Sequence, residues 1–402
     1  MTQPPPHGSR FAAIVEPFRS QRALTTCLRV LYAMLRFVVP TDARQIGFVS
    51  APDLTDNALA LFETLVRSDR SLEYRLIWLV ADRSASRRIL DREFDPSELP
   101  NVSLVSKNTL RGLWTFLRCR TIFLTHGAYG FAHAGYHQTI VNLWHGMPIK
   151  TIGAHTGKAR RDTFFMHYSI ATSDYFAHVI AKAFYLKRDR VLVTGLPRNE
   201  WLFQREEKYL VVKEGRAKLV VWLPTFRSSY VGEIRVDSSA DAPDLLSAAT
   251  LEALDARLDG SDSMLAIKLH PMDVKNRQSW ANYSNIRIYT DAAFQAAGMN
   301  LYKLLACSDA LVTDFSSVAI DYLLLKKPIG LFAPDISAYT RGFIPGVLER
   351  LAAVGHKLTT LEDLANFVIN PPPEHETTAE HELLCQMDLR TPSESILRAA
   401  GL

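Results

Sequence analysis

Short apolar runs alternate with longer amphipathic patterns along most of this sequence. The apolar runs are rich in Val, Ile, Leu and aromatic residues, which is typical of buried strands, and the patterns between them have helical periodicity. The alternation covers residues 44–200 and begins again at residue 218. Strands that alternate with helices pair in parallel and are covered by helices on both faces. The sequence therefore predicts an α/β fold with two parallel sheets.

The predicted elements divide into two halves. The strands expected in the first half are 45–50, 74–81, 102–106, 121–127, 139–146, 167–173 and 190–195, with a helix at 57–68. The strands expected in the second half are 218–226, 264–271, 286–290, 310–314 and 328–333, with helices at 244–257, 299–307 and 316–325. Two such halves describe two Rossmann-like domains that face each other across a cleft, the architecture called GT-B, in which ligands bind beyond the C-terminal ends of strands.

The charged segment 201–216 separates the halves and is predicted to be a hinge helix and linker. The expected division is therefore a tail and basic helix at 1–43, an N-terminal Rossmann-like domain at 44–205, and a C-terminal one at 206–402. A length of 402 residues suits two domains. The helical pattern at 393–401 either closes the second domain or crosses to the first.

Composition excludes some classes of protein. The net charge of +4 is small and the basic residues are dispersed, which argues against a dedicated nucleic-acid binder. The four cysteines lie far apart without metal-ligand spacing, and the N-terminus lacks the pattern of a secretory signal. We therefore expect a cytoplasmic protein with reduced thiols.

Residues 19–39 predict an amphipathic helix that is too interrupted by arginines to span a bilayer. Arg22, Arg29 and Arg36 recur every seven residues and share one face of this helix, opposite a face rich in leucine. Such a helix either lies in an anionic membrane interface or packs on the core with its arginines in solvent. The pattern alone does not separate the two.

Two histidines follow predicted strands at matching places in the two halves. His145 stands in the segment WHGMPIK, which ends in Lys150, and His270 stands in KLHP, which begins with Lys268. An imidazole can accept a proton from an attacking hydroxyl or donate to phosphate oxygens, because its pKa lies near neutral pH. A structural histidine beside a turn is the alternative for each one alone, whereas the repetition favours a site.

The segment VTDFSS places polar side chains where a strand passes directly into a predicted helix. These are Thr313, Asp314, Ser316 and Ser317. Free N–H groups and the positive end of the helix dipole bind phosphate at such a start, and the hydroxyls add donors. The segment is thus a candidate diphosphate cradle, with an ordinary helix cap as the alternative.

Two other segments put an arginine just beyond a strand. They are GLPRN, with Arg198 and Asn199, and PTFR, with Thr225 and Arg227. A guanidinium can bind phosphate through two parallel hydrogen bonds, although exposed arginines are usually only solvated. No common nucleotide-binding loop, Asp-x-Asp triplet or metalloprotease motif occurs. We therefore expect His, Arg, Lys and helix N-termini to stabilise phosphate charge, without a metal or a cofactor.

Taken in order, these segments resemble the CDP-glycerol glycerophosphotransferases, a family that primes and polymerises teichoic acids and some capsules. The matching blocks are Asp56-Asn57-Ala58 with Leu61-Phe62, Ile77-Trp78, 144–150, 195–199, 224–227, 268–271, Ser308-Asp309, 313–317 and Arg341-Gly342-Phe343. Family members commonly carry Trp and Tyr where this chain has Phe226 and Phe315, and both changes are conservative.

The resemblance implies a GT-B fold, a CDP-alditol donor bound mainly by the C-terminal domain, and a lipid-linked saccharide or growing polymer as acceptor. It also implies peripheral attachment at the inner face of the cell membrane. The length fits one catalytic module, which leaves primase and polymerase activity both open. Glycerol is the first candidate for the alditol, with ribitol as the alternative.

The implied reaction is attack of the acceptor hydroxyl on the phosphorus that bears glycerol, with CMP as the leaving group. His145 would be the base or would orient the hydroxyl, and His270 would contact phosphate. The other groups expected to contact the donor or its phosphates are Lys150, Arg198, Asn199, Thr225, Arg227, Lys268, Thr313, Asp314, Ser316 and Ser317.

Two other functions are compatible with the same features. One is a GT-B glycosyltransferase that uses a UDP-sugar, or a UDP-sugar 2-epimerase. The other is a non-catalytic binding protein at the membrane surface that retains the fold. The intact histidines, together with Ser316 and Ser317, favour an enzyme.

Overall fold

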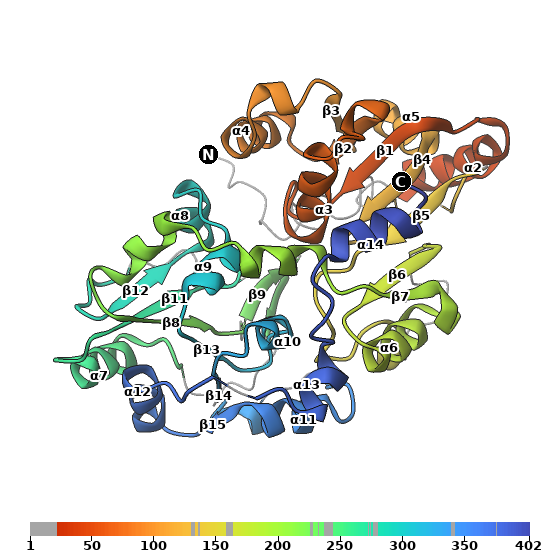
Figure 1. The fold of residues 1–402 in the computed structure, drawn as a ribbon. Coiled ribbons are helices and arrows are strands. Elements are labelled where there is room, and N and C mark those ends of the chain that lie inside the picture. The colour runs from red at the N-terminus through yellow and green to blue at the C-terminus, as the bar shows by residue number, and fades with distance from the viewer. Residues whose placement is uncertain are drawn as a thin grey trace. The chain divides into compact units, whose positions relative to one another are not determined.

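The computed structural model describes residues 22–129, 133–135, 137–157, 164–225, 228–231, 233–236, 244–271, 273, 275, 280–338, 342–374 and 376–402. They separate into two compact units (Figure 1). Unit 1 contains the described residues up to Met147, Ile152–Glu200 and Asp388–Leu402. Unit 2 contains Pro148–Thr151 and Trp201–Met387.

Unit 1 is built on a parallel sheet with the strand order β3-β2-β1-β4-β5-β6-β7. Its strands are β1 (Asp42–Val49), β2 (Arg75–Val80), β3 (Val102–Ser106), β4 (Cys119–Leu124), β5 (Thr139–Asn142), β6 (Tyr168–Ala171) and β7 (Val191–Val193). The chain runs outward from β1 to β3 and then returns to β4 on the other side of β1. Ligands of such sheets bind beyond the C-terminal strand ends at this reversal.

The core of unit 1 consists of the apolar faces of these strands and of the helices that cover them. Its aromatic centre is Phe48, whose ring centroid lies 5.4 Å from Phe62, 5.3 Å from Trp78 and 5.6 Å from Phe123. The helices are α2 (Arg22–Val38), α3 (Asp56–Val66), α4 (Arg83–Glu93), α5 (Leu110–Arg118), α6 (Asp174–Phe184) and α14 (Pro392–Ala399). Side chains cap several of them, since Thr109 accepts a hydrogen bond from a first-turn amide of α5 and Ser173 does so for α6.

Unit 2 repeats this topology with the parallel order β12-β11-β8-β13-β14-β15. Its strands are β8 (Lys218–Leu223), β11 (Ser263–Lys268), β12 (Ile286–Tyr289), β13 (Ala310–Thr313), β14 (Ile329–Phe332) and β15 (His356–Leu358), with a separate antiparallel hairpin of β9 (Ser228–Val231) and β10 (Glu233–Val236). The chain order reverses between β8 and β13. The predicted α/β class with two Rossmann-like halves is confirmed.

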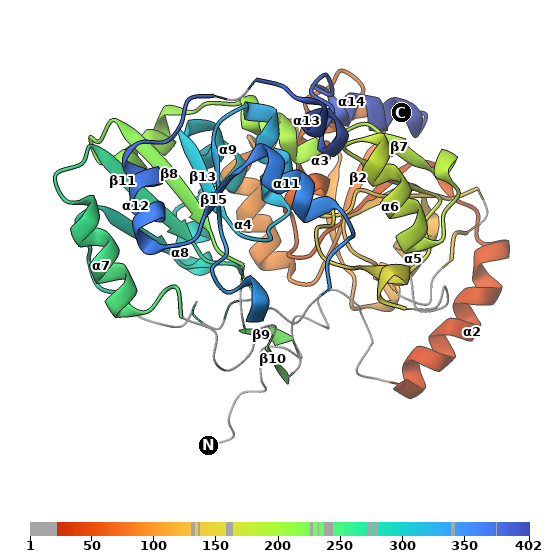
Figure 2. The same ribbon diagram turned by 90° about the horizontal axis from the view of Figure 1, so that it is seen from below.

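The helices of unit 2 are α7 (Ala248–Leu258), α8 (Asp291–Ala296), α9 (Leu301–Cys307), α10 (Val318–Tyr322), α11 (Val347–Val354), α12 (Leu361–Ile369) and α13 (Ala379–Leu384). Helices α7 and α12 lie side by side against the sheet (Figure 2). Together they bury Leu251, Leu254 and Leu364 against Trp222 and Leu265 of the strands. The core of unit 2 is therefore mainly aliphatic around Trp222, whose ring centroid lies 5.7 Å from that of Phe332.

Two predicted helices differ in the structure. The helix expected at 316–325 is α10, which gives way to a 3-10 turn at Leu323–Leu325. The hinge helix expected within 201–216 is replaced by 3-10 turns, one of which covers Glu207–Lys213. There Tyr209 and Val212 are both buried, and a 3-10 turn places residues three apart on the same side.

The segment Asp388–Leu402 belongs to unit 1, although the sequence-based division gave every residue after 205 to the second domain. Helix α14 packs beside α3, and it buries Ile396 and Leu397 there (Figure 1). The Ser393 amide donates a 2.7 Å hydrogen bond to the Glu200 carboxylate. Of the two alternatives for this helix, the structure supports the crossing to the first half. The division also differs at Pro148–Thr151, which belongs to unit 2.

Helix α2 packs on unit 1 through one apolar stripe. Leu28 and Tyr32 of this helix are buried, as is Val39 just after it, and the Tyr32 hydroxyl donates a 2.7 Å hydrogen bond to the His133 carbonyl. The Tyr32 ring also lies 6.5 Å from that of Phe116 on α5. Among the described residues, no helix combines the length and the hydropathy needed to cross a bilayer.

Candidate active site

His145 lies in a tight turn that follows β5 at the C-terminal edge of the unit 1 sheet. The strand ends at Asn142, and its side-chain oxygen then accepts a 3.0 Å hydrogen bond from the Trp144 amide. Trp144 has φ 51° and Gly146 has φ 122°, so the chain reverses through left-handed conformations on both sides of the histidine. Such a conformation is uncommon for a bulky residue and costs free energy, so other contacts must hold the turn.

Asn57, in the first turn of α3, supplies those contacts. Its amide nitrogen donates to the carbonyl groups of Leu143 (3.1 Å) and Trp144 (3.0 Å), and its oxygen accepts from the Arg198 amide (3.1 Å). The side chain is 0% exposed. Both donor hydrogens and the acceptor oxygen of this one side chain therefore fix the His145 turn, a role that the sequence reasoning missed.

Arg198 is bound within unit 1. Its Nη1 donates to the Asp56 carboxylate (2.6 Å) and to the His145 carbonyl (3.2 Å), and the residue is 6% exposed. The sequence interpretation treated this guanidinium as a phosphate ligand at a strand end. In the structure it braces the backbone of His145, so its contact with phosphate stays a prediction.

Asn199, the neighbour of Arg198, is 2% exposed. Among the described residues, neither polar atom of its side-chain amide has a hydrogen-bond partner. Buried amides are normally satisfied, so a partner from outside the chain would relieve this one. The observation is compatible with the predicted role of Asn199 in binding a ligand.

The backbone carbonyl of Thr125, the residue that follows β4, orients the ring of His145. Its Nδ1 lies 3.3 Å from the carbonyl oxygen of Thr125. A carbonyl only accepts, so Nδ1 carries the hydrogen in this contact and Nε2 carries the lone pair. Burial lowers the pKa of His145 and Arg198 lowers it further, while Asp56 and the Thr125 carbonyl oppose the shift. The ring is therefore neutral near pH 7 and is able to accept a proton.

A second imidazole, which the sequence reasoning missed, lies against His145. His126 follows β4, and the two ring centroids are 4.2 Å apart with planes 4° from parallel. Its Nδ1 lies 3.0 Å from the Thr125 hydroxyl. Burial holds the pKa of His126 well below its ordinary value, and the charges of His145 and Lys107 act in the same direction. The signal was present, because His126 and His145 each follow a strand and precede a glycine.

In unit 2, the ends of the neighbouring strands β8 and β13 are joined by side chains. The Asp314 carboxylate accepts hydrogen bonds from the amide and the hydroxyl of Thr225 and from the Phe315 amide. Thr313 is buried and donates to the Leu223 carbonyl (2.8 Å). Three predicted ligand contacts, Thr225, Thr313 and Asp314, thus come together, with their polar atoms bonded to one another or to the backbone.

The next strand end in unit 2 carries Lys268 and His270. Lys268 is buried, and its ammonium group donates to Asp291 (2.8 Å) and to the Leu269 carbonyl (3.0 Å). The sequence interpretation assigned this ammonium group to phosphate, and in the structure it forms an ion pair with Asp291. His270 is half-buried beyond β11, and β11 is paired directly with β8. The structure therefore brings His270 to the same sheet edge as Thr225 and Asp314.

Ser316 and Ser317 are half-buried at the turn between β13 and α10, where Ser317 makes no side-chain cap. Lys150 reaches this part of unit 2 as well, because it forms an isolated antiparallel bridge with Phe343, whose ring lies 5.2 Å from that of Phe315. The WHGMPIK segment is thus divided, with His145 in unit 1 and Lys150 in unit 2. Arg227 lies outside the described residues.

In the parts of the chain that the structure describes, no three His, Cys, Asp or Glu side chains gather closely enough to hold a metal ion.

Known proteins of similar sequence act in teichoic acid synthesis. The chain is 26% identical to the teichoic acid poly(glycerol phosphate) polymerase of Bacillus spizizenii, over 79% of this chain and 82% of that protein. It is 24% identical to the teichoic acid glycerol-phosphate transferase of Staphylococcus aureus, over 78% and 82%. A polymerase of Staphylococcus epidermidis is 28% identical over 53% of this chain, but the match spans only 31% of that longer protein.

The fold is also that of a solved structure. The wall teichoic acid polymerase TagF, in a variant soaked with CDPG, matches 96% of this chain and 98% of its own with a TM-score of 0.72 and 20% identity. This likeness confirms the predicted GT-B fold class. The family model described as CDP-glycerol:poly(glycerophosphate) glycerophosphotransferase matches residues 31–397, which confirms the resemblance read from the motifs. The chain therefore belongs to the CDP-glycerol:poly(glycerophosphate) glycerophosphotransferase family.

Proposed function

We propose that this chain transfers glycerol phosphate from CDP-glycerol to a hydroxyl group of a teichoic-acid-type acceptor and releases CMP. The observation that carries the proposal is the His145 imidazole, which is neutral, fixed in one tautomer and held at the C-terminal edge of a Rossmann-like sheet. Membership of the family supports the choice of donor.

In the proposed step, the acceptor oxygen forms a bond to the phosphorus that bears glycerol. The bond from that phosphorus to the bridging oxygen breaks, and CMP departs with the electron pair. The hydroxyl proton passes to Nε2 of His145, the nitrogen left with a lone pair by the Thr125 contact. General-base help of this kind contributes about 10²- to 10⁴-fold to the rate.

Unit 2 would hold the CDP moiety. His270, Ser316 and Ser317 are half-buried at one sheet edge and can donate hydrogen bonds to diphosphate oxygens. Lys150, which bridges to Phe343, adds a cation to the same unit. Asp314 and Thr225 would serve by fixing the shape of this edge, because their polar atoms already bond to each other.

The donor is tested by incubating the protein with CDP-glycerol, CDP-ribitol or a UDP-sugar and a lipid-linked acceptor, and measuring released CMP or UDP. CMP release with CDP-glycerol is expected, and product length by mass spectrometry separates addition of one unit from polymerisation. Release of UDP in place of CMP would instead support a glycosyltransferase or an epimerase. A failure to turn over any CDP-alditol would support the non-catalytic alternative.

The two histidines are tested separately. His145→Ala should abolish CMP release and leave CDP-glycerol binding measurable by calorimetry, whereas His270→Ala should weaken that binding. His178→Ala is the matched control, because this histidine lies on α6 with its side chain 64% exposed. Turnover by His145→Ala near the wild-type rate would overturn the assignment of the base.

We also propose that unit 1 binds the inner surface of the cell membrane through α2 and α5. Beyond the stripe that packs on the core, α2 exposes a second apolar surface, including Met34, Phe37 (66% exposed) and Val38 (73% exposed). On α5, Leu110 and Trp114 are exposed as well. Figure 2 draws α2 at the edge of unit 1. A large exposed apolar surface near tryptophan and arginine is typical of helices that lie in a bilayer interface.

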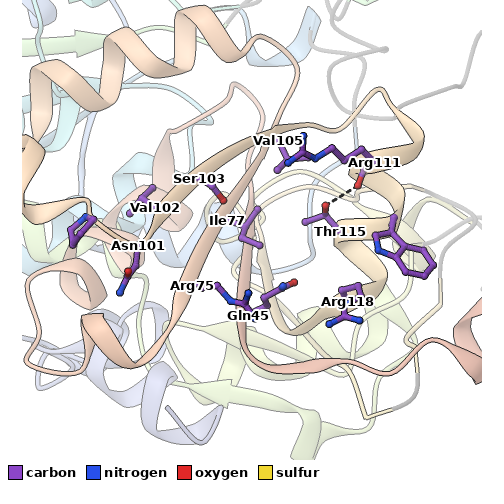
Figure 3. A pocket seen from close by; sticks show the side chains of 12 residues that line it. Gln45, Arg75, Ile77, Asn101, Val102, Ser103, Val105, Arg111, Thr115 and Arg118 are labelled. Carbon is purple, nitrogen blue, oxygen red and sulfur yellow. Dashed lines mark hydrogen bonds between the residues drawn. The ribbon is translucent and has the colours of Figure 1, made fainter.

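A basic pocket beside α5 supports attraction to anionic lipid. It has a volume of about 420 Å³ and is lined by Arg75, Arg111, Arg118 and Trp114, among others. Figure 3 shows Arg75 and Arg118 on one side and Arg111 on the other. Asp42 pairs with Arg75 and Arg118, so this carboxylate and the three arginines together retain positive charge. That charge would attract a phosphate headgroup to this pocket.

Membrane binding is measured by sedimentation with vesicles that contain anionic phospholipid. Phe37→Ser should lower the partition coefficient between vesicles and water by roughly 5- to 30-fold, because the lost aromatic ring would contribute about 1–2 kcal/mol when buried in the membrane. Val211→Ser is the control, since Val211 is 74% exposed on unit 2. Equal binding by both variants and the wild type would contradict the proposed surface.

A further inference from the structure

We propose that His126 is a positioning residue for His145: its ring fixes the plane of the His145 imidazole and limits the stacked pair to one proton. The proposal rests on the proposed function only where it concerns catalysis. The contact between the two rings, and what it does to their protonation, can be measured without any substrate.

The topology of the sheet creates the contact. Strands β4 and β5 are paired in parallel, with Leu124 opposite Asn142. Each strand ends there, and the chain continues for a few residues to its histidine. Nearly parallel rings with centroids 4.2 Å apart are stacked against each other. His145 therefore cannot tilt toward β4 unless His126 moves with it.

Both rings are also fixed from the side. The Nδ1 atom of His145 lies 3.3 Å from the Thr125 carbonyl, and that of His126 lies 3.0 Å from the Thr125 hydroxyl. Thr125, the residue that follows β4, thus contacts both imidazoles. Beside it, a Cβ atom on Gly127 would lie 2.9 Å from the Phe164 ring, so the segment that carries His126 has no room to shift in that direction.

The charged groups around the pair decide which ring takes the proton. His145 faces Asp56, which favours its protonated form, and Arg198, which opposes it. His126 faces Lys107, whose ammonium group lies 2.9 Å from the Asp53 carboxylate, and it faces His145 itself. The carboxylate favours His145 and the cations disfavour His126. The first proton therefore goes to His145, and His126 stays neutral.

A second proton is strongly suppressed. Two unit charges about 4 Å apart in a partly buried site repel each other enough to lower the second proton affinity by about 10³-fold, which is about three pH units. When His145 accepts the proton of the acceptor hydroxyl, the imidazolium therefore stacks on a neutral ring. The faces of neutral aromatic rings attract cations, which stabilises the charge that develops on His145.

The pairing is tested by following the Cε1 protons of both histidines by NMR as the pH is varied, in the protein without substrate. One ring of the wild-type pair should take up a proton only as the pH falls below 6.5, and the other should stay neutral. In His145→Phe the stacking face is kept and the charge is lost, so the pKa of His126 should rise by at least one unit. Two rings that titrate independently, or a His126 pKa that is unchanged in this variant, would overturn the proposal.

The positioning role is tested by the steady-state kinetics of two His126 variants with CDP-glycerol. His126→Phe retains a flat ring and should keep kcat within about fivefold. His126→Ala removes the ring and should lower kcat by about 10- to 100-fold with little change in KM, because small misplacements of a catalytic group have this effect. Equal kcat in both variants, or a loss confined to KM, would refute positioning. The NMR titration keeps the proton-sharing claim testable even if no variant turns over CDP-glycerol.

Discussion

Replacing Asn57 by aspartate isolates the hydrogen bonds that hold the His145 turn. The change keeps the shape of the side chain and its acceptor for the Arg198 amide, but it removes both hydrogens donated to the carbonyls of Leu143 and Trp144. Two buried carbonyl oxygens would then face a carboxylate at about 3 Å. Each buried group left without a partner costs about 1–3 kcal/mol, so we expect unit 1 to lose about 2–6 kcal/mol of unfolding free energy at pH 7.

The loss should depend on pH. The surroundings disfavour the ionised form of the introduced carboxyl group, so its pKa should be raised in the folded state above its unfolded value. The folded state then binds more protons between the two pKa values, and stability falls as the pH rises through that interval. Near pH 3 the protonated acid can donate one hydrogen bond, and the variant should approach the wild type.

The measurement is hydrogen exchange of peptides from β1, β4 and β5 as a function of urea concentration, which reports on unit 1 separately. Asn101→Asp is the control, since Asn101 donates a single 3.3 Å bond to Leu72 near the surface and should cost under about 0.5 kcal/mol. If Asn57→Asp also lowers the unfolding free energy by less than about 0.5 kcal/mol, the two donor bonds do not hold the turn. A stable variant with normal turnover would refute the link between Asn57 and His145 altogether.

Three further outcomes are expected. Glu200→Ala should increase hydrogen exchange in 388–402, because the Glu200 carboxylate accepts a hydrogen bond from the first turn of α14. Burial raises the pKa of Glu200 in the folded wild type, whereas its hydrogen bond with Ser393 favours the ionised form, so the net contribution of Glu200 to stability should fall as the pH rises through its titration. The acid limb of kcat/KM should lie below pH 6.5, since burial lowers the pKa of His145 and its basic form persists at lower pH. Lys107→Met should cost about 3–5 kcal/mol by leaving Asp53 without its buried partner, and adding Asp53→Asn should recover much of the loss, as measured by urea unfolding.

The strands were predictable because their signal is local. A run such as that of β8 is apolar on both faces, and no other arrangement buries it as well as a central parallel strand. The crossing of α14 was not predictable in the same way. Its Ile396 and Leu397 would suit either unit, and the choice depends on Glu200, almost two hundred residues earlier in the chain. A pattern within one helix does not contain that information.

The candidate site shows the same limit. Position at a strand end predicted that His145 and His270 follow strands, and each does so at the C-terminal edge of its own sheet, because parallel strands deliver their C-terminal residues to one edge. The ion pairs of Arg198 with Asp56 and of Lys268 with Asp291 could not be foreseen, because the two aspartates come from other elements of the fold. His126 had the same strand-end position as His145, but only the pairing of β4 with β5 shows that the two rings touch.

The return of residues 388–402 to unit 1 has a consequence for how the protein is made. Unit 2 is formally an insertion within unit 1, since unit 1 takes residues from both sides of Trp201–Met387. During synthesis on the ribosome, every strand of unit 2 has emerged before α14 becomes available. The unit that carries His145 is therefore completed after the other, and a stall or cleavage near residue 388 would leave a finished unit 2 and an unfinished unit 1.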